Sequence, residues 1–256
     1  MNLLTELIKY HWTAKHRHGI HSPFVYALSD RCFSKELSKE FLHTEKDLFA
    51  RFLRSTKIIS VNDLGKGSRK LKKKRTVRDT FKTSSCRGKK GQVLYRLSNY
   101  FRPSNILELG TSLGIGTWYL NQGFPEAHIT TIEGCAETLG VARELNPVFD
   151  LDQVHSFNCS FETFLDTCPP NTTFDLIYID GHHDGKALLH YLDLLEKHSD
   201  DETLFILDDI RWSRDMLDAW KTIIQLPSYH VTVDLFHQGL VWKRSQQEEE
   251  HFVLRC

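Results

Sequence analysis

The stretch Ile106–Thr117 constrains the fold of this chain more than any other, because it reads as a strand, a tight turn and a helix start. A short apolar strand is expected at 105–109, and glycines at 110, 114 and 116 lead into a helix. Glycine permits a tight turn and lets a ligand approach the backbone, and a helix N-terminus offers free N–H groups. This stretch therefore predicts a turn that binds a ligand.

The chain beyond residue 91 repeats this pattern, with short apolar runs that alternate with amphipathic stretches. Such alternation predicts an α/β fold: a Rossmann-like, doubly wound and mostly parallel sheet covered on both faces. Strand-like runs in the tail predict an antiparallel hairpin at the sheet edge. The expected strands are 105–109, 128–132, 153–157, 174–179 and 203–207, the expected helices 115–122, 135–145, 184–197 and 213–225, and the tail runs 229–236, 239–243 and 251–255.

Residues 1–90 are predicted to form an N-terminal helical cap with a basic segment, and residues 91–256 the core domain. Apolar residues at helical spacing predict helices at 2–12 and 36–54, and Ser22 followed by Pro23 predicts another helix start. Four histidines in this region lack an acid or cysteine at a spacing that suits a metal, so a turn packed over the active site is favoured. These are His11, His16, His18 and His21.

One basic segment stands out in a chain that is neutral overall. The sequence holds 33 basic and 33 acidic residues, yet Lys66–Lys90 carries twelve lysines and arginines against the single acid Asp79. The segment could be a solvated loop, attract an anionic acceptor or clamp phosphates of a nucleic acid. It lacks the interleaved aromatic residues expected of a surface that binds single strands. Its role therefore stays open.

The six cysteines show no Cys-x-x-Cys pair, which favours free thiols over a zinc site or a disulfide framework. The N-terminus lacks the continuous apolar core and the cleavage site that a signal peptide would have. No apolar run approaches the roughly 20 residues that cross a bilayer. A cytoplasmic protein without a membrane partner is expected.

Two acidic residues accompany the glycine turn. Glu108 lies near the end of the first strand, and Glu133 ends the strand that follows. An acid at the end of the second strand can accept both ribose hydroxyls of an adenosine cofactor. The spacing Glu-x-Gly-x-x-x-Gly-x-Gly, together with Glu133, resembles class I S-adenosylmethionine-dependent methyltransferases. A similar turn at Asp63–Ser68 is disfavoured, because neither an amphipathic helix nor a second acidic strand end follows it.

Later segments extend this resemblance. Phe174–Asp180 looks like the fourth strand of such enzymes and Leu204–Asp209 like the fifth. The likeness is strongest to the branch of catechol and caffeoyl-coenzyme A O-methyltransferases. The whole chain, with His18–Phe24, Asp63–Ser68 and His251–Arg255, also resembles a group of uncharacterised methyltransferases from Bacteroidetes. That second likeness implies a fold and a cofactor but no substrate.

The resemblance implies S-adenosyl-L-methionine as the cofactor. Glu108 and the glycine turn would hold its amino-acid end, Glu133 its ribose, and the loop at Cys159 its adenine. The full set of predicted cofactor-binding residues is Glu108, Gly110, Thr111, Gly114, Gly116, Glu133, Cys159, Ser160 and Asp180.

The acceptor side is expected at the ends of the fourth and fifth strands. Asp180 would face the reacting centre, and His183 would serve as general base, since a neutral imidazole suits that task near pH 7. In the resembling branch two acids and an asparagine bind magnesium or calcium. Asp180, Asp208 and Asp209 match those positions, and three carboxylates could hold Mg²⁺ or another divalent cation. Asp208 could equally be satisfied by backbone N–H groups without a metal.

The function that follows is S-adenosylmethionine-dependent methyl transfer to an oxygen of a small-molecule acceptor, and an anionic acceptor is one option. One alternative is an RNA methyltransferase that uses residues 66–90, and another is a non-catalytic protein that binds the cofactor. The glycine spacing disfavours a nicotinamide oxidoreductase. The acceptor, the metal requirement and the oligomeric state, including a homodimer, stay open at this stage.

Overall fold

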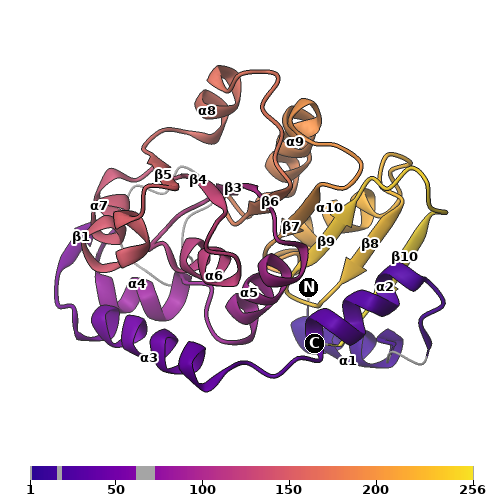
Figure 1. Cartoon of the computed structure of the whole chain (residues 1–256), viewed down its shortest axis with the longest axis horizontal. Coiled ribbons are helices and arrows are strands. Elements are labelled where there is room, and N and C mark those ends of the chain that lie inside the picture. Colours follow the sequence, from indigo (N-terminus) through magenta and orange to yellow (C-terminus); the bar gives the residue numbers. More distant parts are fainter. Residues whose placement is uncertain (1, 16–18, 62–72, 256) are drawn as a thin grey trace.

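The fold is built on an eight-stranded sheet with the strand order β10-β8-β9-β7-β6-β3-β4-β5. The computed structural model describes residues 2–15, 19–61 and 73–255. Figure 1 shows the sheet edge-on between two layers of helices. The strands are β3 (Asn105–Leu109), β4 (His128–Ile132), β5 (Val154–Phe157), β6 (Leu176–Ile179), β7 (Leu204–Leu207), β8 (Val231–Asp234), β9 (Gly239–Trp242) and β10 (Glu250–Val253).

The sheet confirms the predicted fold class. Strands β7, β6, β3, β4 and β5 pair in parallel, as connections through helices require. Strands β8 and β9 form the predicted antiparallel pair, and β9 also joins β7 in antiparallel register. Strand β10 closes the edge in parallel with β8. The core helices are α5 (Lys89–Phe101), α6 (Ile115–Gly123), α7 (Ala136–Leu145), α8 (Phe161–Thr167), α9 (Gly185–Leu195) and α10 (Arg214–Ile223).

Two hydrophobic layers cover the two faces of the sheet, and alternation along each strand decides which layer a side chain joins. In β3, Ile106 belongs to the layer that contains α5 and α6, whereas Leu107 and Leu109 belong to the layer with α8, α9 and α10. Figure 1 shows α8 and α9 on the opposite side of the sheet from α5 and α6. The central strands are buried on both faces, which explains their continuous apolar runs.

The N-terminal region is helical, as predicted, and packs on the same layer as α5 and α6. Pro23 opens α2 directly after Ser22, and Phe24 packs edge-on against Trp242 at a ring distance of 5.2 Å. The predicted boundary at residue 90 falls inside α5. The elements are α1 (Leu3–Thr13), α2 (Pro23–Ala27), the π-helix η2 (Leu28–Phe33) and α3 (Lys39–Arg54).

The second half of the basic segment forms regular structure that the sequence did not predict. Strand β2 (Lys74–Thr76) pairs antiparallel with β1 (Ile58–Ser60), and α4 (Val77–Ser84) follows it. The Thr76 side chain caps α4 by accepting the backbone N–H of Asp79. The apolar face of α4 is short, with Val77 and Phe81 fully buried.

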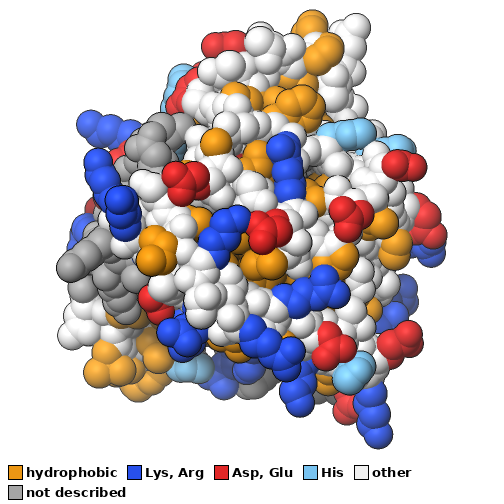
Figure 2. Space-filling model, turned by 90° about the vertical axis from the view of Figure 1, so that its left-hand side faces the viewer, with side chains coloured by type: hydrophobic (Ala, Val, Ile, Leu, Met, Phe, Trp, Pro, Cys, Tyr) orange, Lys and Arg blue, Asp and Glu red, His pale blue; other side chains and the backbone are white. Residues whose placement is uncertain are grey.

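Several sequence features lie outside the described residues. They include His16 and His18 of the histidine group, the Asp63–Ser68 turn and the basic residues up to Lys72. On the face that carries β1 and α7, basic side chains are interspersed with acidic ones (Figure 2). Within the described ranges, no helix is long and apolar enough to span a bilayer.

Candidate active site

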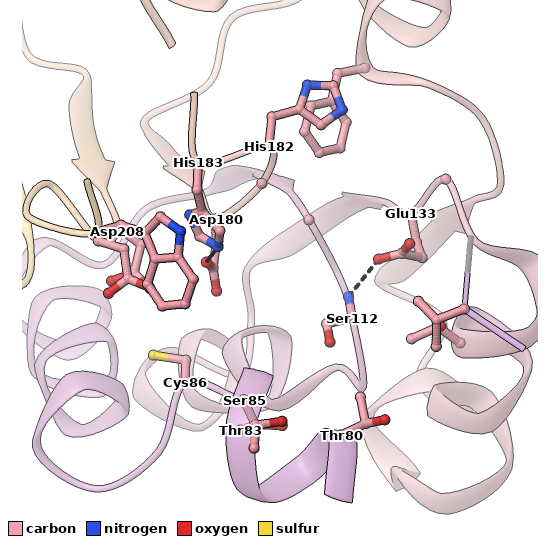
Figure 3. Close-up of a pocket in the computed structure, with 18 of the residues that line it drawn as sticks. Thr80, Thr83, Ser85, Cys86, Ser112, Glu133, Asp180, His182, His183 and Asp208 are labelled. Carbon is pink, nitrogen blue, oxygen red and sulfur yellow. Dashed lines mark hydrogen bonds and ion pairs between the residues drawn. The ribbon is translucent and has the colours of Figure 1, made fainter. Parts of the chain in front are cut away.

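One pocket opens at the carboxyl ends of the parallel strands β3, β4, β6 and β7, with α4 and the start of α5 opposite them. Parallel strands bring their carboxyl ends to one edge of a sheet, where ligands of such folds bind. Figure 3 shows Ser112 and Glu133 at one end of this pocket and Asp180, His183 and Asp208 at the other. The predicted residues that line it are Gly110, Glu133, Cys159, Ser160, Asp180, His183, Asp208 and Asp209.

Gly110 begins the turn after β3 with a backbone that other residues rarely adopt, at a φ of 111°. A Cβ atom at this position would lie 2.1 Å from the backbone carbonyl oxygen of Asp180. The glycine therefore lets the end of β3 pass close to the end of β6. This close approach brings the glycine turn and Asp180 to the same side of the pocket.

Glu108 is fully buried beneath the turn and does not line the pocket, in contrast to its predicted place at the cofactor. Its Oε2 atom accepts hydrogen bonds from the hydroxyls of Thr117 at 2.5 Å and Thr131 at 2.6 Å. Burial raises the pKa of Glu108 to about 8, although both hydroxyls oppose the shift. Glu108 is therefore a neutral support of the turn near pH 7.

Three further residues of the predicted cofactor set also lie outside the pocket lining: Thr111, Gly114 and Gly116. The Thr111 and Thr131 hydroxyls are 2.6 Å apart, and both are buried. Gly116 leaves room for Glu108, because a Cβ atom there would lie 2.4 Å from Oε1 of that side chain. These residues shape the turn from behind.

Glu133 stands at the end of β4 and points its carboxylate toward the glycine turn. Its two oxygens accept the backbone N–H groups of Ser112 and Cys135, each at 2.8 Å. The side-chain amide of Asn158 donates to the Glu133 carbonyl oxygen at 2.7 Å. These bonds orient a carboxylate that lines the pocket, and carboxylate oxygens accept hydrogen bonds from the vicinal hydroxyls of a ribose. The residues present fit an adenosine cofactor at this end.

Asp180 and His183 lie together at the other end of the pocket (Figure 3). The Tyr178 hydroxyl donates to Oδ2 of Asp180 at 3.0 Å, and Nε2 of His183 is 4.0 Å from Oδ1 of Asp180. The His183 ring packs on Trp212 at a centroid distance of 5.3 Å. This histidine has a φ of 42°, in a region that costs of order 1–3 kcal/mol for most side chains. The fold therefore holds the imidazole in place beside Asp180.

His182 faces a different network, although it also lines the pocket. Its Nδ1 atom is hydrogen-bonded to the Tyr191 hydroxyl, which also donates to Glu162 at 2.7 Å. Burial lowers the pKa of His182 below the ordinary value for histidine. Its ring is thus fixed against α9, and His183 is the histidine nearer to Asp180.

Lys90 is a site residue that the sequence reasoning missed, because it was counted only as part of the basic segment. Its ammonium lies 2.7 Å from Oδ2 of Asp208 and 2.9 Å from Oδ1 of Asp209. Burial alone would lower the pKa of Lys90, but Asp208 and Asp209 raise it well above its ordinary value. Lys90 therefore keeps its positive charge.

The carboxyl groups of the cluster respond to burial and to Lys90 in different ways. Burial raises the pKa of Asp180 and of Asp208, with Lys90 opposing the shift in both. Burial alone would also raise the pKa of Asp209, but Lys90 and His183 lower this pKa below the ordinary value. Asp209 is thus the carboxylate that balances the charge of Lys90.

The three aspartates do not fit a divalent cation in this arrangement, in contrast to the metal site expected from the sequence. The ammonium of Lys90 already contacts both Asp208 and Asp209. Among residues 2–15, 19–61 and 73–255, no three His, Cys, Asp or Glu side chains are arranged to hold a metal ion. The physical reason is that the positive charge of Lys90 already neutralises part of the negative charge that would attract a metal ion.

The wall opposite the strands comes from the basic segment, for which attraction of an anionic acceptor was one of the roles that the sequence left open. Thr80, Thr83 and Ser85 line it with hydroxyls, beside Cys86 (Figure 3). Arg75 also lines the pocket and is only 8% exposed. This wall is therefore polar and carries a basic group.

The strand order and the pocket at the carboxyl ends of the parallel strands define the class I methyltransferase fold. Residues 107–210 match the family model described as a methyltransferase domain. No protein of curated function matches the chain. The chain is an S-adenosylmethionine-dependent methyltransferase, as its sequence predicted.

Solved structures share this fold at low sequence identity. An O-methyltransferase from Bacillus cereus, in complex with S-adenosylhomocysteine, is 17% identical, with a TM-score of 0.57 over 86% of this chain and 96% of its own. An S-adenosylhomocysteine-bound methyltransferase from Podospora anserina is 16% identical, with a TM-score of 0.56 over 88% and 97%. A candidate O-methyltransferase from Klebsiella pneumoniae is 24% identical, with a TM-score of 0.53 over 62% and 81%.

Proposed function

We propose that this methyltransferase transfers the methyl group of S-adenosylmethionine to an oxygen of a small-molecule acceptor. The observation that carries the proposal is that one pocket joins Glu133 to Asp180 and His183. One end of it offers a carboxylate for a ribose, and the other a histidine within reach of a carboxylate. The O-methyltransferase from Bacillus cereus, which binds S-adenosylhomocysteine on the same fold, supports this reading.

At the cofactor end, Glu133 would accept the ribose hydroxyls while Ser112 and Cys135 keep its carboxylate oriented. Cys159 and Ser160 would border the adenine, and Phe161 adds an apolar ring to the same wall. Bound there, the cofactor supplies an activated methyl group on a sulfonium sulfur, which leaves as a neutral thioether. Holding donor and acceptor in one geometry supplies most of the acceleration in such a displacement.

At the acceptor end, His183 would take the proton of the acceptor hydroxyl on Nε2 as the oxygen forms its bond to the methyl carbon. The electron pair of the broken carbon–sulfur bond goes to sulfur. The carboxylate of Asp180, 4.0 Å from Nε2, would stabilise the imidazolium that results. Trp212 limits the motion of the His183 ring and keeps it directed at the pocket.

The acceptor itself is proposed to be a small anion. Arg75 lines the wall that faces the strands, whereas the hydroxyls of Thr80 and Thr83 on that wall donate to backbone carbonyl oxygens. A guanidinium group binds carboxylates and phosphates well. The acceptor would thus carry a carboxylate or phosphate group away from its reacting hydroxyl.

The test is to incubate the full chain with methyl-labelled S-adenosylmethionine and cell extract, and to follow the label by mass spectrometry. We expect label in a small molecule, in a bond that behaves as a methyl ether or ester. His183→Gln should lower the rate roughly 100-fold or more, as loss of a general base does. Binding of S-adenosylhomocysteine, measured by calorimetry, should stay unchanged in this variant.

His190→Gln is the matched control, because His190 is exposed on α9. It should leave both the rate and the binding unchanged. Label recovered in RNA instead of a small molecule would contradict the proposed substrate class. Transfer that proceeds at full rate in His183→Gln would contradict the proposed role of His183.

A further inference from the structure

Lys90 places a partly buried positive charge against side chains from a distant part of the chain. Its Nζ atom contacts Oδ2 of Asp208 and Oδ1 of Asp209, and the Asp208 side chain is only 1% exposed. Lys90 also lines the pocket, with its side chain 24% exposed. The Lys90 ammonium thus lies between the two carboxylates that follow β7 and the acceptor end of the pocket.

The local structure around Lys90 does not favour a lysine at this position. Lys90 lies in the first turn of α5, which contains no acid, and the N-terminus of a helix repels positive charge. Asp209, its partner, has a φ of 50°, which costs free energy in most residues. The ion pairs to Asp208 and Asp209 offset both costs. Lys90 is therefore explained by the carboxyl cluster and not by the helix that carries it.

We infer that the ammonium of Lys90 is a built-in cation that stands in place of a divalent metal ion at Asp180, Asp208 and Asp209, and that it holds the acceptor oxygen by a hydrogen bond. An ammonium has three N–H donors. Asp208 and Asp209 take two of them among the described side chains. The third is available to a molecule in the pocket that Lys90 lines.

This arrangement has a consequence for the class of acceptor. A divalent cation with several open coordination positions can bind two neighbouring oxygens at once. The single remaining N–H of Lys90 can hold only one. We therefore expect acceptors with one reacting hydroxyl and no requirement for a second hydroxyl beside it. This role at the acceptor rests on the proposed function, whereas the exclusion of a divalent cation does not.

The test measures Mn²⁺ binding to the full chain by electron paramagnetic resonance, without any methyl acceptor. Wild type should show no saturable binding that depends on Asp208. Lys90→Ala and Lys90→Gln remove the ammonium and leave the carboxylates, so both should bind Mn²⁺ saturably, at least about tenfold more tightly than any residual binding by wild type. Mn²⁺ should also raise the melting temperature of these variants and not that of wild type.

Three controls separate the charge of Lys90 from other effects of substitution. Lys89→Ala removes the adjacent exposed lysine and should behave as wild type. Lys90→Arg keeps the positive charge and should also exclude Mn²⁺. Lys90→Ala combined with Asp208→Asn should lose the Mn²⁺ binding that Lys90→Ala gains.

Several outcomes would overturn the inference. Wild type that binds Mn²⁺ tightly, and loses it in Asp208→Asn, would show a true metal site, and this arm needs no Lys90 variant to fold. Folded Lys90→Ala and Lys90→Gln without gain in Mn²⁺ binding would show that Lys90 does not fill a cation position. Methyl transfer that stops in excess chelator would also overturn the inference, because it would show that the reaction needs a metal ion. Failure to find any acceptor would count against the proposed function and leave the Mn²⁺ results unaffected.

Discussion

The backbone N–H of Ser112 donates to Oε2 of Glu133 at 2.8 Å, and this bond ties the glycine turn after β3 to the end of β4. The second oxygen of Glu133 accepts the N–H of Cys135. Glu133→Gln removes the charge and turns one of the two acceptors into a donor. We expect about a thirtyfold weaker affinity for S-adenosylhomocysteine, or about 2 kcal/mol, by calorimetry.

Glu137→Gln is the matched control for this prediction. The Glu137 carboxylate also accepts a backbone N–H, that of Ser60 at 2.6 Å, but it does not line the pocket. The affinity should stay within about twofold of wild type. Equal losses in Glu133→Gln and Glu137→Gln would mean that Glu133 acts only through the stability of the loop.

Gly110→Ala should destabilise the whole domain. The φ of 111° and the contact of 2.1 Å with the Asp180 carbonyl oxygen leave no room for a Cβ atom. We expect a loss of about 3 kcal/mol in the free energy of unfolding, measured by urea denaturation. Gly140→Ala, in α7 with no atom near its added Cβ, should instead gain about 0.5–1 kcal/mol. A Gly110→Ala variant as stable as wild type would show that the turn can rearrange.

The buried Glu108 predicts a pH dependence of stability. Its pKa rises from 4.5 to about 8 on folding, so the folded chain keeps a proton that the unfolded chain loses between these values. A raised pKa contributes stability that is present below about pH 4.5 and is lost as pH rises through about 8. The glutamine side chain of Glu108→Gln stays neutral at every pH, so this variant does not lose stability in this way.

The measurement compares urea unfolding of Glu108→Gln and wild type at several pH values. From pH 6 to pH 8 the stability of the variant relative to wild type should rise by about 2 kcal/mol. A difference between the two proteins that stays constant over this range would place the carboxyl of Glu108 in a more polar environment than the structure shows.

Most of the fold could be predicted because its signals are local. Strands β6 and β7 are apolar runs of four residues, and the glycines of the turn after β3 mark where a helix begins. The C-terminal hairpin followed from the strand-like runs in the tail. Helix α4 was missed because its buried face is short and charged residues surround it, so tertiary packing of Phe81 on Phe49 and Phe52 decides its place.

The candidate site could be predicted only where its residues stand at the carboxyl ends of strands. Glu133, Asp180, Asp208 and Asp209 end their strands and line the pocket as a parallel sheet requires. Lys90 could not be foreseen, because it is 118 residues from Asp208 in sequence and looks like one of many lysines. The place of Glu108 depended on burial behind the turn, which a motif does not reveal.

The last prediction concerns the basic segment, where Lys74 and Arg75 point to opposite faces of β2. Arg75 is buried and lines the pocket, whereas Lys74 is exposed. We use 4-hydroxybenzoate as an anionic probe, titrated by calorimetry into protein saturated with S-adenosylhomocysteine. Arg75→Gln should weaken its binding about tenfold and flatten the salt dependence, because a partly buried guanidinium interacts strongly with a carboxylate.

Lys74→Gln should leave the binding of this probe within about twofold, or roughly 0.4 kcal/mol, because water and salt screen an exposed charge. The neutral analogue 4-hydroxybenzamide should lose much less affinity in Arg75→Gln than the benzoate does. Equal effects of the two substitutions would show that the segment acts through its total charge. In that case the position of Arg75 in the pocket wall would have no part in choosing the acceptor.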